Sequence, residues 1–206
     1  MGYDPSRTGA MKKVISRITK RTIPAIGALA LVFATSCSRP SNQPNRAAKR
    51  SADASGTQTV TGRVVAIADG DTVTILDSSD TQHRIRLAGI DAPETHQVFG
   101  EQSRLSLSEM ILGKDVSVNY QKIDQYGRLV GKILLDGKDI NLEQVKAGMA
   151  WHYKEYQREQ TPEDRELYAR AEDEARAARR GLWQDPNPVE PSAFRKEEKR
   201  ERRNGG

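Results

Sequence analysis

The sequence predicts a domain of the α+β class that is mainly β: a small, antiparallel five-stranded barrel with three helices packed against it. Five short segments rich in β-branched residues follow one another, most of them joined by short turns. A helical segment lies between the third and the fourth of these, and two more helices follow the fifth. This is the plan of an OB-fold. Residues 58–185 are long enough to form one such domain around a single core.

The strands are separated by turn residues such as Gly and Asp, and valine, isoleucine and threonine are frequent in them. The third strand contains the run RIRL at residues 84–87, in which polar and apolar side chains alternate as in a half-buried strand. Its arginines are therefore expected on one face and its apolar side chains on the other. The five strands are expected at residues 59–67, 71–77, 83–90, 114–120 and 128–135.

The three helices have recognisable start and stop signals. The first is expected at residues 100–113 and ends at a glycine. The second is expected at residues 139–148, with Asn141 as its N-cap. The third begins with Thr161 as its N-cap, followed by a proline. Its apolar stripe is expected to lie on the barrel and consists of Leu167, Ala171, Ala175, Ala178 and Leu182.

The N-terminal part indicates export. Residues 1–36 are expected to be a signal peptide that starts at Met11, since a basic stretch precedes a short apolar run and the letters FATSCS. Cys37, the single cysteine, lies where a lipid would be attached; ordinary cleavage nearby, which leaves a free thiol, is the alternative. Residues 37–57 are expected to be a flexible tether. The protein is therefore expected to be a cell-envelope lipoprotein or to be secreted.

The charge balance excludes a broadly basic surface on the predicted domain. The chain has 33 basic and 28 acidic residues, a net charge of +5. Without residues 1–36 the counts are 27 and 27, and residues 58–185 contain 17 basic and 22 acidic residues. A polyanion would therefore bind this domain at a local site. Residues 186–206 carry charges of both signs and are expected to be a solvated, disordered tail.

Three short stretches place charged residues at the ends of predicted strands. Taken singly, each has a simpler interpretation. The first and the third would be turns between strands, and the second a solvent-facing arginine pair before a proline-containing loop. They are ADGDTV (with Asp69 and Asp71), RIRLAGIDAPE (with Arg86, Asp91 and Glu94) and DQYGRLVG (with Tyr126 and Arg128).

Taken together, these stretches indicate phosphodiester hydrolysis. Carboxylates from neighbouring strand ends can converge on one hard cation, which prefers several oxygen ligands. Arginines on adjoining strands can bind a phosphate through paired hydrogen bonds and stabilise charge as it develops. A cation, a polarised phosphate and a group that orients water are the parts that such a reaction needs.

The motifs DGDTV, RLAGIDAPE and YGR, in this order and at these separations, resemble those of the staphylococcal nuclease (thermonuclease) family. The letters GLW at residues 181–183 match the C-terminal end of the family's domain. The resemblance covers residues 58–185. It implies a calcium ion held by Asp71, Asp91 and the backbone carbonyl of Ala92, with Asp69 in the outer shell; Ala92 stands where the prototype has threonine.

The resemblance also implies the roles of the remaining site residues. Glu94 corresponds to the general base, or to the group that orients the attacking water. Arg86 and Arg128 correspond to the arginines that bind and polarise the phosphate. The segment THQVFGEQS after Glu94 is shorter than the prototype's mobile loop. Aromatic residues expected near the bound nucleotide are Tyr126, Trp151 and Tyr153.

The expected function is that of a calcium-dependent endonuclease that hydrolyses DNA and RNA with little sequence preference and leaves 3′-phosphates. Single strands are expected to be preferred, because an OB-fold groove accepts splayed bases. The protein is expected to be a monomer that meets a membrane only through its lipid. One alternative is a nucleic-acid-binding module without turnover, whose sign would be loss of Arg86, Glu94 or Arg128, all of which are present. The other is a structural surface lipoprotein, in which the acidic turns are only turns.

Overall fold

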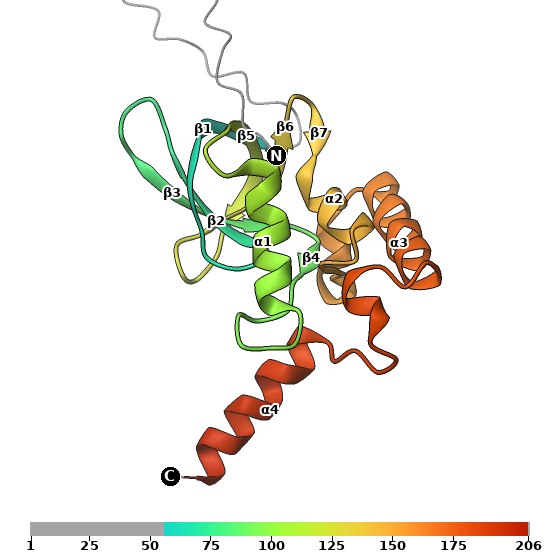
Figure 1. The fold of residues 1–206 in the computed structure, drawn as a ribbon. Coiled ribbons are helices and arrows are strands. Elements are labelled where there is room, and N and C mark those ends of the chain that lie inside the picture. Colours follow the sequence, from blue (N-terminus) through green and yellow to red (C-terminus); the bar gives the residue numbers. More distant parts are fainter. Residues whose placement is uncertain (1–55, 206) are drawn as a thin grey trace, which may run out of the picture. The chain divides into compact units, whose positions relative to one another are not determined.

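The computed structural model describes residues 56–205 (Figure 1). The expected signal peptide at residues 1–36, Cys37 and the tether as far as residue 55 lie outside the described residues. Within residues 56–205, no helix combines the length and the apolar character needed to cross a bilayer.

Five strands form the barrel, in the order β3-β2-β1-β5-β6, and a direct pairing between β3 and β6 closes it. The five-stranded OB-fold predicted from the sequence is therefore confirmed. All neighbouring pairs are antiparallel except β3 and β6, which run parallel; the sequence pattern indicated antiparallel pairing only. The strands are β1 (Gln58–Ile67), β2 (Thr72–Leu76), β3 (Gln82–Leu87), β5 (Asp115–Ile123) and β6 (Leu129–Leu135).

The alternation in β3 determines which side chains face the core. Ile85 and Leu87 are buried, whereas Arg84 is exposed and Arg86 is half-buried on the opposite face. The pairing register places Arg86 opposite Thr72 of β2. Arg86 therefore lies at the end of the sheet where the acidic turn before β2 begins.

Three two-residue strands, too short to be predicted from periodicity, complete the sheets. β4 (Ile90–Asp91) pairs with β8 (Trp151–His152), with Asp91 opposite Trp151. β7 (Lys138–Asp139) pairs with the end of β6. The pairing of β4 holds the backbone of Asp91 in place beside the barrel.

The helices lie outside the barrel. In Figure 1, α1 (Gly100–Ile111) crosses the strands, and α2 (Ile140–Lys146) and α3 (Pro162–Ala177) pack beside one another. Two short 3₁₀ helices, η1 (Lys154–Glu159) and η2 (Gly181–Gln184), precede and follow α3. The three predicted helices are thus present, and Thr161 caps α3 as expected, accepting a hydrogen bond from the Asp164 amide.

The expected cap of α2 was wrong by two residues. Asp139 is the N-cap and accepts a hydrogen bond from the Leu142 amide at 3.0 Å. Asn141 is fully buried, and its amide group satisfies backbone groups of two other segments instead. Its partners are the Ile133 amide and the carbonyls of Ala88 and Gly131.

The expected stripe of α3 was partly wrong. Ala171 and Ala175 are buried, as is Leu182 beyond the helix, but Leu167 and Ala178 are exposed. Tyr168 is the large side chain that α3 contributes to the core, and its hydroxyl donates to Asp139. A tyrosine can be buried here because that carboxylate accepts its hydrogen bond.

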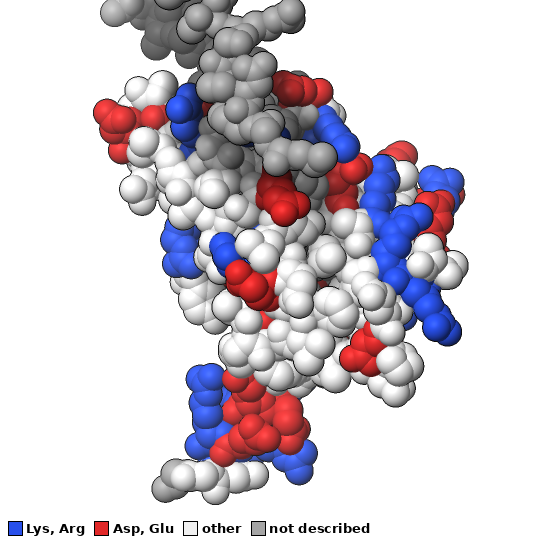
Figure 2. All heavy atoms as spheres, in the orientation of Figure 1, with Lys and Arg blue, Asp and Glu red and all other residues white. Residues whose placement is uncertain are grey.

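The tail differs from the disordered segment that its charges indicated. It contains the helix α4 (Pro191–Asn204), with Pro191 in the first turn. Ion pairs at helical spacing, such as Arg200 with Glu197 at 3.5 Å, support its exposed part. Figure 1 shows α4 running from beneath the loop before α1, and Figure 2 shows both signs of charge together on its surface.

Candidate active site

The acidic turn between β1 and β2 is built around a glycine. Asp69 accepts a hydrogen bond from the Asp71 amide at 2.9 Å, so these residues do form a turn. Gly70 between them is buried, and any side chain there would collide with Ser103 of α1 and with Ala92. The turn therefore packs against α1 only with glycine at this position, and this packing directs Asp71 toward the end of β3.

Arg86 joins Asp71 to a second buried carboxylate, that of Asp91 on β4. Its Nη1 lies 2.8 Å from Oδ2 of Asp71, and its Nη2 donates to Oδ1 of Asp91 at 2.9 Å. Nη1 also donates to the backbone carbonyls of Leu87 and Ile90. The guanidinium is thereby fixed between the two carboxylates, as preorganised binding of an anion requires.

Asp71 is a carboxylate that ionises with difficulty in this position. Burial raises the pKa of Asp71 to about 7, and the charges of Asp69 and Asp91 contribute in the same direction. Arg86 and the hydrogen bond from the Ala92 amide, at 2.8 Å, act in the opposite direction. A divalent cation beside Asp71 would relieve this repulsion.

Asp71→Asn is expected to stabilise the metal-free protein at high pH. Because the pKa of Asp71 is raised by folding, the native state holds this proton more tightly, and stability falls as pH rises from about 4 to about 7. The raised pKa already includes the attraction of Arg86, so the substitution removes this fall as a whole. The gain in stability at pH 8 should be on the order of a few kcal/mol.

Thermal unfolding in chelator at pH 4.5 and pH 8 measures this effect. The difference between variant and wild type should be small at pH 4.5, where Asp71 is neutral, and several degrees in Tm at pH 8. Asp115→Asn, at an exposed position at the start of β5, is the matched control. A variant less stable than wild type at pH 8 would show that ionised Asp71 stabilises the fold.

Arg128 approaches the cluster from the start of β6. Its Nε donates to Asp124 at 2.7 Å, and Nη1 lies 3.4 Å from the Thr72 hydroxyl, which in turn donates to Asp71. Burial alone would raise the pKa of Asp124, but hydrogen bonds from Arg128 and the Tyr126 amide lower it below its usual range. Asp124 therefore stays ionised and orients Arg128.

Glu94 is held by its backbone and leaves its carboxylate at the edge of the cluster. The Gln97 amide donates to the Glu94 carbonyl at 2.8 Å, and any side chain at Gly100 would collide with that carbonyl. The carboxylate accepts a hydrogen bond from Arg195 at 2.8 Å. Arg195 also binds both carboxylate oxygens of Asp91, at 3.1 and 2.9 Å. Glu94 and Asp91 thus share one cation from α4.

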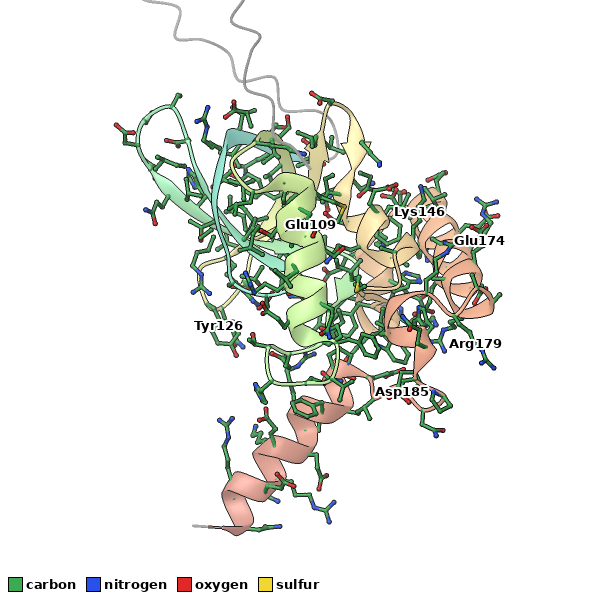
Figure 3. All side chains as sticks on the ribbon, in the orientation of Figure 1. Glu109, Tyr126, Lys146, Glu174, Arg179 and Asp185 are labelled. Carbon is green, nitrogen blue, oxygen red and sulfur yellow. The ribbon has the colours of Figure 1, made fainter. Side chains whose placement is uncertain are left out.

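A cavity of about 490 Å³ opens beside these side chains. Its polar lining includes both arginines of the cluster, and its other side is aromatic, which suits a phosphate next to a base. Tyr126 is exposed at the rim, where Figure 3 shows it pointing away from the barrel. Burial, then the charge of Asp91, raises the pKa of Tyr153 to about 12, so its phenol stays neutral. The charged and aromatic residues of the lining are Arg86, Lys122, Asp124, Tyr126, Arg128, Tyr153, Tyr156, Glu159 and Arg195.

Trp151 does not lie on this cavity, contrary to the expectation from the sequence. It is 8% exposed and packs against Trp183, with ring centroids 4.4 Å apart. Arg176 of α3 stacks on both rings. Its position opposite Asp91 in the β4–β8 pair directs the indole into a small second core, formed with Ala175, Leu182 and Trp183. Trp151 is therefore buried there and does not line the cavity.

The donor chemistry of the cluster fits a hard divalent cation. Asp71 and Asp91 are buried carboxylates that face one arginine, and oxygen ligands of this kind suit calcium. In this arrangement, however, Arg86 and Arg195 bind the carboxylate oxygens. Within the described part of the chain, no three acidic, histidine or cysteine side chains converge as a ready metal site. The Ala92 carbonyl stays a predicted ligand.

The structure brings together six of the predicted residues and adds two that sequence reasoning missed. The six are Asp69, Asp71, Arg86, Asp91, Glu94 and Arg128. Tyr156, on the same cavity wall as Tyr153, was missed although it follows three residues later in an aromatic segment. Arg195 was missed because nothing in the mixed-sign tail distinguishes it from its neighbours.

Comparison with known proteins gives consistent results. A family model described as "Staphylococcal nuclease homologue" matches residues 84–185. The "Uncharacterized endonuclease" of Haemophilus influenzae is 42% identical over 139 residues, which cover 68% of this chain and 75% of the relative. The "Micrococcal nuclease" of Shigella flexneri is 40% identical over 147 residues, 67% of this chain and 82% of the relative. The "Protein ParB" of Escherichia coli is 39% identical over 153 residues, 70% of this chain and 84% of the relative.

Proposed function

Since this chain belongs to the staphylococcal nuclease family, we propose that it is a calcium-dependent endonuclease that hydrolyses DNA and RNA with little sequence preference, leaving 3′-phosphates. The observation that carries the proposal is the ion-paired cluster of Asp71, Arg86 and Asp91. Arg86 of this cluster lines a cavity that is also lined by Arg128 and three tyrosines. Binding, charge stabilisation and water activation are thus available within one site.

Each side chain has a role that follows from its surroundings. Arg86, fixed by two carboxylates and two backbone carbonyls, would bind the scissile phosphate and stabilise its developing charge. Arg128, oriented by Asp124, would bind the same phosphate from the other side. Glu94 would orient or deprotonate the attacking water once its carboxylate is free. A calcium ion held by Asp71, Asp91 and the Ala92 carbonyl, with Asp69 behind, would supply charge neutralisation at a phosphate oxygen.

The shape of the site favours single strands as substrate. Tyr153 and Tyr156 offer ring faces on which an unpaired base can stack, and such stacking tolerates any sequence. The acidic balance of residues 58–185 also makes broad contact with a duplex backbone unfavourable. The apolar run before Cys37 supports the further proposal of an exported monomer held at the cell envelope by a lipid.

The test is cleavage of heat-denatured DNA, duplex DNA and RNA by the purified full chain, with calcium, with magnesium and with chelator. Calcium-dependent cleavage, fastest on denatured DNA and giving 3′-phosphate ends by mass spectrometry, is expected. Binding of DNA by the folded protein without cleavage in any metal would overturn the enzyme and favour the nucleic-acid-binding module. Cleavage in chelator would overturn the metal dependence alone.

A further inference from the structure

The C-terminal helix α4 inserts one side chain into the carboxylate cluster. The guanidinium of Arg195 binds Asp91 in a bidentate manner, with Nη1 to Oδ1 at 3.1 Å and Nη2 to Oδ2 at 2.9 Å. The same Nη1 donates to Glu94 at 2.8 Å. Asp91 is 2% exposed, so this ion pair is shielded from water on the Asp91 side.

The first two turns of α4 dock on the loop that follows Glu94. The Phe194 ring lies 5.3 Å from that of His96, and His96 also contacts Glu198 at 2.7 Å. The Gln97 side chain donates to the carbonyl of Val189 just before the helix, at 2.7 Å. Arg195 is therefore delivered by a docked element, in contrast to the later turns of α4, which are exposed.

The short link between η2 and α4 favours this docking. Leu182 and Trp183 of η2 are buried in the body of the domain, and only residues 185–190 separate η2 from α4. Figure 3 shows Asp185 where the chain leaves η2. A short link of this kind gives the helix a high effective concentration at its docking site.

Arg195 occupies the groups that the proposed reaction needs. Both oxygens of Asp91, an expected metal ligand, are bound, and so is the carboxylate of Glu94, the expected water-orienting group. Arg195 thus supplies a single positive charge at the carboxylates where a divalent cation would supply two. We propose that α4 is an intramolecular inhibitor, whose Arg195 competes with the divalent cation for Asp91 and keeps Glu94 from the attacking water.

This inference rests on the proposed function, because it assumes that Asp91 is a metal ligand. It differs from a role of Arg195 in binding substrate. Arg86 also binds Asp91, but through Oδ1 alone, whereas Arg195 binds both oxygens of Asp91 and the carboxylate of Glu94 as well. An arginine stays protonated at any working pH, so release depends on competition by a cation and not on deprotonation.

The competition has a measurable consequence for calcium affinity. If the docked form predominates, the apparent Kd is the intrinsic Kd divided by the undocked fraction. Removing Arg195 should therefore lower the Kd for calcium by about tenfold or more when the undocked fraction is about a tenth or less. The rate of cleavage should rise at low calcium and change little at saturating calcium.

The experiment is calorimetric titration of the full chain with calcium alone, comparing wild type, Arg195→Gln and Phe194→Ala. Phe194→Ala loosens the docking of α4 without touching the carboxylates, so it tests the proposal even if loss of Arg195 disturbs folding. The matched control is Arg200→Gln on the exposed part of the same helix. Hydrogen exchange of residues 191–204, with and without calcium, reports directly on undocking.

Tighter calcium binding in Arg195→Gln and Phe194→Ala but not in Arg200→Gln, with faster exchange of α4 in calcium, is the expected result. Unchanged or weaker calcium binding in both variants would overturn the proposal. So would a rise in KM for DNA at unchanged calcium affinity, which would make Arg195 a substrate-binding residue. Tighter calcium binding without cleavage by any form would keep the competition between Arg195 and calcium but refute the nuclease.

Discussion

Glu94→Gln is expected to lower the cleavage rate by about two to four orders of magnitude while leaving the fold intact. The rate effect is the typical contribution of a positioned acid–base group. The fold should survive because the backbone of Glu94, not its carboxylate, makes the structural contacts, with Gln97 and against Gly100. The side chain is 30% exposed and has Arg195 as its ion-pair partner. Loss of that pair should cost less than about 1 kcal/mol.

Single-turnover cleavage at saturating calcium, together with chemical unfolding, measures both parts. Glu101→Gln is the matched control, because this glutamate lies nearby on α1, is 53% exposed and pairs with Arg104. Its rate should stay within about twofold of wild type, since surface substitutions away from the site have small effects. A Glu94→Gln rate within tenfold of wild type would mean that water is oriented by another group.

The barrel and the acid–arginine cluster could be predicted because their signals are local. Alternation in β3 determines the face of Arg86, and short turns place Asp71 and Arg128 at the starts of β2 and β6, the two strands that flank β3. The family motifs then supplied the roles that the residue types alone left open. Antiparallel pairing throughout was wrong for β3 and β6, because the closing pair of a barrel joins strands far apart in the sequence.

The wrong assignments have one physical cause: tertiary contacts determine where these side chains lie. Asn141 is as good an N-cap as Asp139 on propensity, but the barrel needs its amide to pair three buried backbone groups. Trp151 looked like a base-stacking ring, yet the β4–β8 pairing directs it toward Trp183. Sequence spacing does not contain this information.

The helix α4 was the largest omission, and only part of it had a signal. Pro191 at the helix start and charge pairs three or four residues apart, such as Arg200 with Glu197, favour a helix. The helix lacks an apolar stripe, since Pro191 is its one buried residue. Its docking brings Arg195 to Asp91, 104 residues earlier, and no local pattern reports such a contact.

Arg86→Ala is expected to cost both stability and activity, but for different reasons. Without this guanidinium, Asp71 keeps no arginine partner and Asp91 keeps Arg195 alone, while two backbone carbonyls lose a donor. Unpairing buried charges in this way should destabilise the metal-free protein by about 3 to 5 kcal/mol. Cleavage should fall by about three orders of magnitude or more, because a preorganised phosphate-binding group is lost.

Calcium separates the two effects. A divalent cation between Asp71 and Asp91 replaces the lost positive charge, so calcium should restore most of the stability of Arg86→Ala. It should not restore the activity, because a cation bound to the carboxylates cannot replace the contact that Arg86 would make with the phosphate. Urea unfolding and cleavage rates, each measured with calcium and with chelator, test this. The control is Arg84→Ala, because Arg84 is exposed on the same strand two residues away; its stability and its cleavage rate should match those of wild type. If calcium restored neither, Asp71 and Asp91 would not be the ligands. If it restored both, the arginine would serve only to neutralise the carboxylates, and the phosphate would have to be held by Arg128 alone.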